Sequence, residues 1–218
     1  YSYQFDEELQ QEWKWSEKYS AQPEILDYLN HVADRFDLKK DIEFNTEVIS
    51  ATFDEKKSLW LIQTSNEKIE AKFCVMATGC LSAPNTPDFK GLSDFQGQLL
   101  HTGKWPQNPI DFTDETVAII GTGSSSIQSI PVIAEQAKHL YVFQRTANYS
   151  IPANNKPLDP DEIRYVKDNY SSIREKQRQG RAGVAFTNMG TKSALEVSKE
   201  ERLNEYQKRW DTGYSGFI

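Results

Sequence analysis

A glycine turn at residues 121–123 constrains the fold of this chain more than any other feature. The short apolar run Thr116 to Ile120 leads into Gly121-Thr122-Gly123, and a helical run that carries Ile127, Ile130 and Ile133 follows. Glycine gives the tight turn between a strand and a helix at no steric cost. A buried strand, a glycine turn and a helix in this order predict an α/β fold with parallel strands.

The same turn predicts a site for a pyrophosphate. Gly121 permits the tight turn, and Gly123 lets a ligand approach the backbone, where the helix start supplies N–H donors and the positive end of its dipole. Ser126 stands where a third glycine is usual, so the helix should pack slightly less closely on the strand. A glycine turn with only a structural role remains an alternative.

The strand His139 to Phe143 decides which dinucleotide fits. Enzymes that use NAD place an acidic residue at the end of this strand, where it binds the ribose 2′-hydroxyl. Here the strand runs into Gln144-Arg145-Thr146, without Asp or Glu. The forked cation of Arg145 and the hydroxyl of Thr146 suit a 2′-phosphate instead. The sequence therefore favours NADP, with an ordinary surface arginine as the alternative.

Short β patterns precede the turn. Alternation predicts a small antiparallel meander, and the last run, Phe73 to Met76, is apolar throughout, as in a strand buried on both faces of a parallel sheet. That run ends in the small residues Ala77, Thr78 and Gly79, which can lie against a dinucleotide or simply form a strand-to-loop turn. The expected strands are Ile42–Phe44, Val48–Phe53, Leu59–Thr64 and Ile69–Met76.

Helical patterns fill both ends of the chain. A surface helix is expected from Asp6 to Trp15, and a helix from Pro23 to Phe36 has His31 off its apolar face, which indicates a solvated side chain rather than a ligand. Pro131 should bend or interrupt the helix after the glycine turn. Capping patterns predict further helices from Asp159 with Glu162 to Gly180, and from Ser198 with Glu201 to Gly213.

Composition excludes several classes of protein. The net charge of −7 argues against nucleic acid as a partner, and no apolar run approaches the ~20 residues of a membrane span. Cys74 and Cys80 have no metal-type spacing, so we expect no metal site and reduced thiols in a cytoplasmic protein. The chain starts at Tyr1 without Met and ends at Ile218 within an apolar pattern, so we expect an internal fragment.

A long irregular stretch, residues 80–114, joins the two α/β segments and carries the pattern Phe95-x-Gly97-x3-His101-x3-Trp105-Pro106. Long irregular connections are usually functional or link domains. The pattern resembles, position for position, the fingerprint of the type I Baeyer–Villiger monooxygenases. Residues 121–125 and 143–146 are similar to that family's NADP domain, and residues 1–3 and 15–19 to its cyclohexanone- and phenylacetone-type members. The resemblance covers essentially the whole chain.

The resemblance implies an enzyme that binds FAD and NADPH and inserts one oxygen atom of O2 beside a ketone carbonyl through a C4a-peroxyflavin, giving an ester or lactone. It implies that His101 couples the two domains, and that Arg145 and Thr146 hold the 2′-phosphate. The residues that would line the NADP pyrophosphate beside Gly121 are Thr122, Gly123, Ser124, Ser125, Ser126, Ile127 and Gln128. Those that would contact FAD are Tyr1, Val48, Ala77, Thr78 and Gly79.

The resemblance also implies a division into domains. We expect two Rossmann-like domains: residues 1–90 as the C-terminal part of an incomplete FAD domain, residues 91–114 as the linker with the fingerprint, and residues 115–218 as an incomplete NADP domain with a helical insertion. The family's first FAD glycine motif, the aspartate just before Tyr1 and the active-site arginine are absent, so this fragment alone should be inactive and depend on missing segments of its parent chain.

Two alternatives to the Baeyer–Villiger reaction stay open. A related flavin monooxygenase could oxygenate nitrogen or sulfur, although the Trp105-Pro106 ending of the fingerprint argues against that class. A nucleotide-binding module without catalysis would account for the missing FAD segment. The preferred partners are a ketone and O2.

Overall fold

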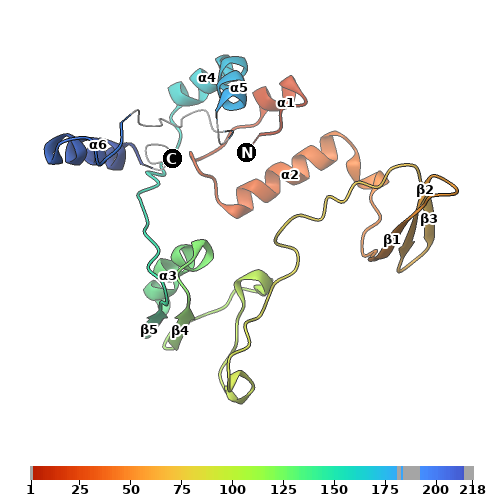
Figure 1. Ribbon diagram of the computed structural model, residues 1–218, viewed down its shortest axis with the longest axis horizontal. Helices are drawn as coiled ribbons and strands as arrows, with labels where there is room; N and C mark the ends of the chain where they lie inside the picture. Colours follow the sequence, from red (N-terminus) through yellow and green to blue (C-terminus); the bar gives the residue numbers. More distant parts are fainter. Residues whose placement is uncertain (1, 181–182, 184–191, 214–218) are drawn as a thin grey trace. The chain divides into compact units, whose positions relative to one another are not determined.

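The protein forms two compact units in a computed structural model that describes residues 2–180, 183 and 192–213. The helical unit comprises Tyr1–Phe44 and Ser150–Ile218, and the α/β unit comprises Asn45–Tyr149. Figure 1 shows the α-helices of the first unit and the strands of the second. The fold is mixed α/β, with one antiparallel and one parallel sheet. The division into an FAD domain, a linker and an NADP domain, with boundaries expected after residues 90 and 114, stays a prediction.

The helical unit is built on a small apolar core between its first two α-helices. Leu9, Tyr28 and Val32 are buried, and Trp13, Trp15 and Phe36 pack around them. The Tyr28 hydroxyl accepts a hydrogen bond from the Tyr3 N–H at 2.9 Å, and burial raises the pKa of Tyr28. The described elements of this unit are α1 (Glu7–Glu12), α2 (Gln22–Arg35), the 3-10 turn η1 (Leu38–Asp41), α4 (Pro160–Asp168), α5 (Tyr170–Gln179) and α6 (Lys199–Thr212).

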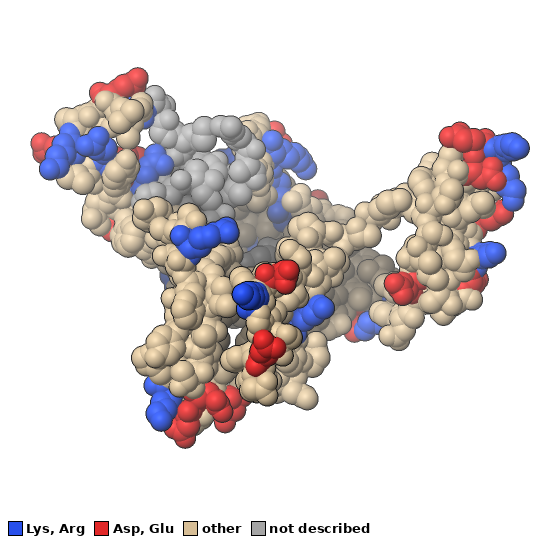
Figure 2. All heavy atoms as spheres, turned by 60° about the horizontal axis from the view of Figure 1, so that its bottom comes forward, with Lys and Arg blue, Asp and Glu red and all other residues tan. Residues whose placement is uncertain are grey.

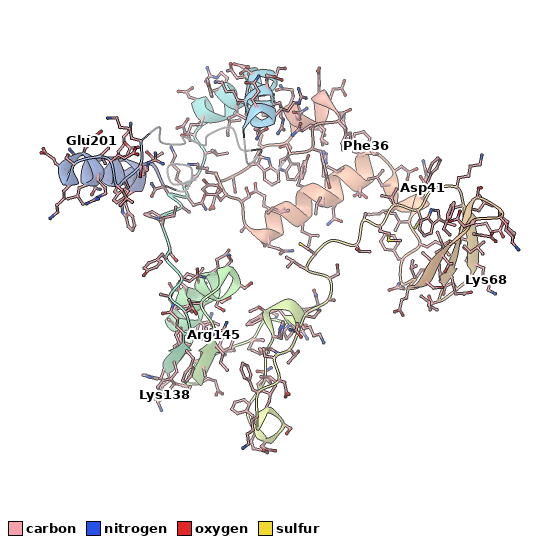
Figure 3. All side chains as sticks on the ribbon, viewed as in Figure 1. Phe36, Asp41, Lys68, Lys138, Arg145 and Glu201 are labelled. Atoms are coloured by element: carbon pink, nitrogen blue, oxygen red, sulfur yellow. The ribbon has the colours of Figure 1, made fainter. Side chains whose placement is uncertain are left out.

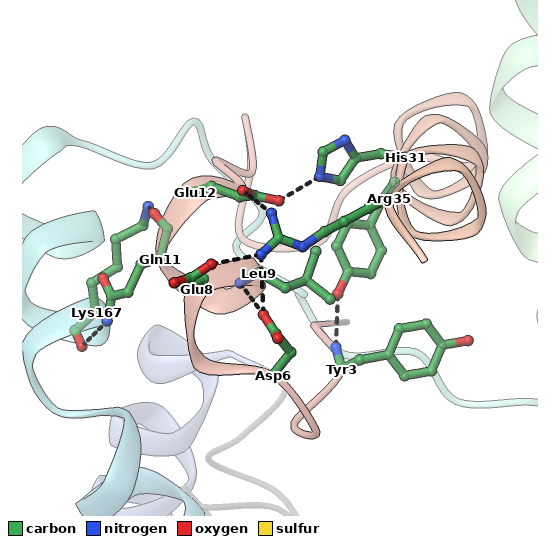
Figure 4. Close-up of polar contacts among 10 residues, drawn as sticks. Tyr3, Asp6, Glu8, Leu9, Gln11, Glu12, His31, Arg35 and Lys167 are labelled. Carbon is green, nitrogen blue, oxygen red and sulfur yellow. Dashed lines mark hydrogen bonds and ion pairs between the residues drawn. The ribbon is translucent and has the colours of Figure 1, made fainter. Parts of the chain in front are cut away.

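A network of charged side chains joins α1 to α2 (Figure 4). The Arg35 guanidinium lies 3.5 Å from Asp6, 3.0 Å from Glu8 and 2.6 Å from Glu12. The His31 imidazole, expected to be solvated, shares the Glu12 carboxylate through Nε2 at 2.6 Å and is half-buried. Single exposed pairs contribute about 0–1 kcal/mol, so the network aligns two helices that Leu9 and Tyr28 already hold together.

The caps expected from the sequence are present. Asp159 accepts from the Glu162 N–H at 2.8 Å while Glu162 accepts from the Asp159 N–H at 3.4 Å, which forms a capping box. Ser198 caps α6 through the Glu201 N–H at 3.1 Å. The helix expected from Asp159 to Gly180 is divided at Asn169 into α4 and α5. On the face drawn in Figure 2 acidic and basic side chains intermix, as is typical of solvated helix faces.

The α/β unit begins with the expected antiparallel meander. Strands β1 (Val48–Asp54), β2 (Leu59–Thr64) and β3 (Lys68–Ala71) pair in sequence order, so β1 is an edge strand. The register of β1 against β2 shifts between Val48 and Ser50, which marks a bulge. Two 3-10 turns follow in the linker, η2 (Leu92–Asp94) and η3 (Thr102–Lys104).

A parallel pair of strands completes the α/β unit. Strand β4 (Thr116–Ile120) pairs with β5 (His139–Phe143), and helix α3 (Ser124–Gln136) connects them and packs against both. Val117 and Ile119 are half-buried while the residues that alternate with them are exposed. The expected burial of this strand is therefore wrong in part, because among the described residues a helix covers only one face.

Three other expectations are corrected. The run Phe73–Met76 is not a strand: Phe73 and Val75 are 85% and 87% exposed, because no described strand lies beside it to pair its backbone. Ile42–Phe44 is likewise irregular. Pro131 does not interrupt α3, since the flanking turns keep their own bonds, from the Ile127 N–H to Gly123 O and from the Ala137 N–H to Ile133 O. The alternative, a bend at Pro131, stays a prediction.

The surface helix expected from Asp6 to Trp15 is shorter than expected, and its Leu9 is completely buried. Gly180 and Gly213 end α5 and α6 as expected. Within the described residues no helix is both long and apolar enough to cross a membrane.

Replacing Leu9 by alanine tests the core of the helical unit. The substitution removes a fully buried side chain, so we expect the free energy of unfolding of the whole protein to fall by about 2–5 kcal/mol in denaturant titrations. Leu9→Met keeps the volume and should cost less than about 1.5 kcal/mol. Equal stability of Leu9→Ala and the unmodified protein would contradict this account of the core.

Candidate functional site

The glycine turn joins the ends of the two parallel strands. Gly121 has φ +102°, a backbone conformation that side-chain-bearing residues rarely adopt. Its N–H donates to the Phe143 carbonyl oxygen at 2.8 Å, which continues the ladder from β4 into the turn. The turn therefore lies at the carboxyl edge of the parallel pair, where ligands of α/β sheets bind.

Gly123 begins helix α3 and leaves its first turn open to a ligand. The residue is the N-cap of α3 and supplies no side-chain cap to the N–H groups that follow it. A Cβ placed on Gly123 would meet no atom within 4 Å. Open space in front of uncapped N–H groups and the positive helix dipole is suited to an anion.

Two polar side chains one turn into α3, those of Gln128 and Ser129, bond to backbone carbonyls within the helix. Gln128 Nε2 donates to the Ser124 carbonyl at 2.7 Å, and Ser129 Oγ donates to the Ser125 carbonyl at 2.9 Å. Ser126 is half-buried and Ile127 is exposed. The expected lining from Thr122 to Gln128 thus presents backbone N–H groups at its first residues.

Arg145 and Thr146 are exposed just after β5, near the start of α3 (Figure 3). The Arg145 guanidinium makes no ion pair and no hydrogen bond with any described residue. Because no carboxylate of the described residues lies within ion-pair distance of it, this arginine has its five N–H donors available for a ligand.

The glycine turn is held by two amide side chains of the segment after β5 that carries Arg145. The sequence did not mark either of them as a site residue. Gln144 Nε2 donates to Thr122 Oγ1 at 2.8 Å, and Asn148 Nδ2 donates to the Thr122 carbonyl at 2.9 Å. The sequence feature that could have pointed to these residues is the presence of two amide side chains, each with N–H donors, in the loop that follows β5. Their partner could not be read from the sequence because it depends on how residues 144–148 fold back.

His101 lies in the linker, and its ring bonds to the backbone of Gly103 in the linker and of Asn85 before it. Its Nδ1 accepts the Gly103 N–H at 3.0 Å, so its Nε2 carries the proton and donates to the Asn85 carbonyl at 3.2 Å. Gly97 is covered by the ring of Phe95, since a Cβ there would lie 2.6 Å from a ring carbon. The glycine and histidine of the fingerprint therefore shape this loop itself.

The residues expected to contact FAD do not form one cluster among the described residues. Val48 is exposed at the bulge of edge strand β1. Ala77, Thr78 and Gly79 form an exposed irregular segment in which Gly79 has φ +69° and Ser82 Oγ donates to the Thr78 carbonyl. Tyr1 lies outside the described residues. The described residues also contain no group of three or more metal-ligating side chains.

The structure therefore brings together one part of the predicted site. Residues 121–123, the first turn of α3 and residues 144–148 share the carboxyl edge of β4 and β5. Val48, residues 77–79 and His101 lie on other segments. The assembled part offers backbone donors and Arg145, a cation that has no ion pair with the part of the chain that the structure describes. These are the groups that bind a phosphate ester.

Alanine substitutions at Gly121 and Gly123 distinguish a glycine that is required for its backbone conformation from one that leaves room for a ligand. Gly121→Ala forces a side-chain-bearing residue to φ +102°, so the free energy of unfolding should fall by about 1–3 kcal/mol. At Gly123 the φ of −70° and the open space accommodate a side chain, so Gly123→Ala should lower the free energy of unfolding by less, at most about 1 kcal/mol, through the poorer N-cap. Thermal and denaturant unfolding of the whole protein without added nucleotide measures the stability of both variants. Equal losses of stability would contradict the view that Gly121 is required for its positive φ.

Comparisons with known proteins show the family of the chain. The family model described as pyridine nucleotide-disulphide oxidoreductase matches residues 4–214. A Baeyer-Villiger monooxygenase of Pseudooceanicola batsensis is 42% identical over 98% of this chain and 39% of its own length. Phenazine N-monooxygenase PhzNO1 of Lysobacter antibioticus is 38% identical over 100% of this chain and 40% of its own length.

Solved structures give the same result. The structure described as oxidized steroid monooxygenase bound to NADP matches with a TM-score of 0.89 and 54% identity, over 97% of this chain and 40% of that one. The chain thus spans about 40% of the length of the relatives it matches. It belongs to the pyridine nucleotide-disulphide oxidoreductase family, and its resemblance to the Baeyer–Villiger monooxygenases is confirmed.

Proposed function

We propose that this chain supplies the NADP site and part of the FAD site of a flavin-dependent monooxygenase. The whole protein would use NADPH and O2 to convert a ketone to an ester or lactone. The observation that carries the proposal is the open glycine turn at the start of α3 beside the unpaired Arg145. The relatives named as Baeyer-Villiger and cyclohexanone monooxygenases support the reaction.

The residues at the turn fit NADP. The open space at Gly123 would admit the pyrophosphate, and the uncapped N–H groups of α3 would donate to its oxygens. Arg145 would hold the 2′-phosphate through paired hydrogen bonds, with the Thr146 hydroxyl as a further donor. The segments would thus fix the nucleotide by both of its charged groups. A matching structure is described as bound to NADP, which supports the same choice.

The residues of the α/β unit also fit one side of an FAD site. As an edge strand, β1 leaves backbone N–H and C=O groups unpaired within the described sheet, and Val48 lies at its bulge. The exposed irregular segment at residues 77–79 has small side chains that allow close approach of a ligand. We propose that these segments belong to the FAD domain, one of two Rossmann-like domains, which other parts of the protein would complete.

In such an enzyme the flavin supplies the oxygen-transfer chemistry, and the protein supplies binding and orientation. The part played by this chain would be to hold NADPH by its pyrophosphate and 2′-phosphate, which fixes the position of the nicotinamide. His101, with one ring nitrogen bonded to Gly103 in the linker and the other to Asn85 before it, would hold the start of the linker in one shape. We propose it as a coupling residue, with no proton transfer to the substrate.

N-oxygenation is a second candidate reaction. The relative named phenazine N-monooxygenase matches the whole chain, at an identity close to that of the Baeyer-Villiger relative. The NADP site described above would serve either reaction. The substrate therefore has to be decided by assay rather than by this part of the protein.

The whole protein tests the proposed function. After purification it should carry a yellow flavin, oxidise NADPH faster when a ketone is added, and place one atom of isotopically labelled O2 in an ester or lactone detected by mass spectrometry. Conversion of a nitrogen heteroaromatic compound such as phenazine to its N-oxide, with no turnover of ketones, would favour the second candidate. A colourless protein that releases no flavin on denaturation would contradict both.

Arg145→Ala tests the choice of cofactor. Loss of charged hydrogen bonds to the 2′-phosphate should weaken NADPH binding by about 1.5–3 kcal/mol, which is about 10- to 150-fold, with little change for NADH. Titration calorimetry with both nucleotides measures the difference. Arg178→Ala, which removes another exposed arginine paired with Glu175, is the control and should leave both affinities unchanged. Equal losses for the two nucleotides would show that Arg145 does not contact the 2′-phosphate.

A further inference from the structure

The peptide between Thr122 and Gly123 is held from one side only. Its carbonyl oxygen accepts the Asn148 Nδ2 hydrogen bond at 2.9 Å. The N–H of the same peptide, on Gly123, makes no hydrogen bond with any described residue. In a planar trans peptide the C=O and N–H groups point in opposite directions. By fixing the carbonyl, Asn148 therefore aims the Gly123 N–H away from residues 144–148.

This orientation is not imposed by the local backbone. Reversing a peptide plane changes ψ of the residue before it and φ of the residue after it, and the residue after it is glycine. Glycine adopts positive and negative φ about equally readily, so the Thr122–Gly123 peptide has two accessible orientations. A Cβ at Gly123 would have open space around it, so packing does not choose between them either. The Asn148 hydrogen bond is the described interaction that selects one.

The two orientations differ in what they present to an anion. With the carbonyl held by Asn148, the turn presents the Gly123 N–H at the open start of α3, in line with the uncapped donors that follow. With the peptide reversed, it presents a carbonyl oxygen, whose partial negative charge repels a pyrophosphate. Gln144 adds to the selection, because its Nε2 holds the Thr122 side chain at 2.8 Å.

We propose that Asn148 is a positioning residue for the pyrophosphate of the nucleotide, which it affects by fixing the Thr122–Gly123 peptide, without touching the ligand. The inference rests on the proposed function, since it takes the turn to be the NADP site. Asn148 follows Arg145 by three residues in the same segment. One short segment would then serve both charged groups of the nucleotide, with Arg145 binding one directly and Asn148 organising the donors for the other.

The test measures three ligands on the whole protein by titration calorimetry. NADP⁺ has both the pyrophosphate and the 2′-phosphate, NADH has only the pyrophosphate, and adenosine 2′-monophosphate has only the 2′-phosphate. Asn148→Ala should weaken NADP⁺ and NADH by the same factor, about three- to tenfold for one neutral hydrogen bond, and leave adenosine 2′-monophosphate unchanged. The unchanged third ligand separates positioning from a general loss of structure.

Three further variants sharpen the test. Asn148→Asp removes the N–H donor and adds a charge that repels the carbonyl and the pyrophosphate, so it should weaken NADP⁺ and NADH more than Asn148→Ala. Asn148→His keeps a ring N–H donor in place of Nδ2 and should restore part of the affinity. Arg145→Ala should give the opposite pattern, with loss of adenosine 2′-monophosphate and NADP⁺ and retention of NADH.

The possible results distinguish this inference from the function on which it rests. If Asn148→Ala binds both dinucleotides as the unmodified protein does while Arg145→Ala shows its selective loss, the inference is wrong and the NADP site stands. If Asn148→Ala also loses adenosine 2′-monophosphate, Asn148 has a general structural role and the inference is again wrong. If the unmodified protein binds neither dinucleotide, both the inference and the proposed function fall.

Discussion

The hydrogen bond from the Gly121 N–H to the Phe143 carbonyl, at 2.8 Å, is the contact on which the candidate site depends. It extends the parallel pairing of β4 and β5 into the glycine turn, so that the turn and the segment after β5 meet at one edge. With Gly121 at φ +102°, the chain can reverse there and begin α3 at once. The open N–H groups, Arg145 and the amides of Gln144 and Asn148 are all positioned by this junction.

Two arginines of the chain, Arg35 and Arg145, differ in whether carboxylates surround them, and this difference separates a structural role from a functional one. Arg35 lies among the carboxylates of Asp6, Glu8 and Glu12, where it joins α1 to α2. Arg145 has no carboxylate within ion-pair distance among the described residues, in a chain whose net charge is −7. In such an acidic protein an arginine kept away from carboxylates at the edge of a parallel sheet is suited to an external phosphate.

Local signals in the sequence predicted most of the helices and strands. The predictions failed where an element depends on contacts with segments distant in the sequence. The capping residues Asp159 and Ser198 and the alternation in β1 and β2 determined boundaries because they act within a few residues. Phe73–Met76 has the composition of a buried strand but lacks a described partner strand. Its composition could not reveal this, because strand pairing depends on segments distant in the sequence. Pro131 was expected to bend or interrupt a helix whose flanking turns hold it together. Gly123 and Arg145 were predictable as a site, whereas the contact of Asn148 with Thr122 depends on a loop conformation.

The most direct test of the central claim is a crystal structure of the whole protein with NADP⁺ bound. The account predicts pyrophosphate oxygens within hydrogen-bond distance of the backbone N–H groups that begin α3, with the Gly123 N–H among them and Asn148 still bonded to the Thr122 carbonyl. It also predicts the 2′-phosphate on the Arg145 guanidinium. A pyrophosphate bound away from residues 121–125, or a 2′-phosphate held by other cations with Arg145 in solvent, would contradict it.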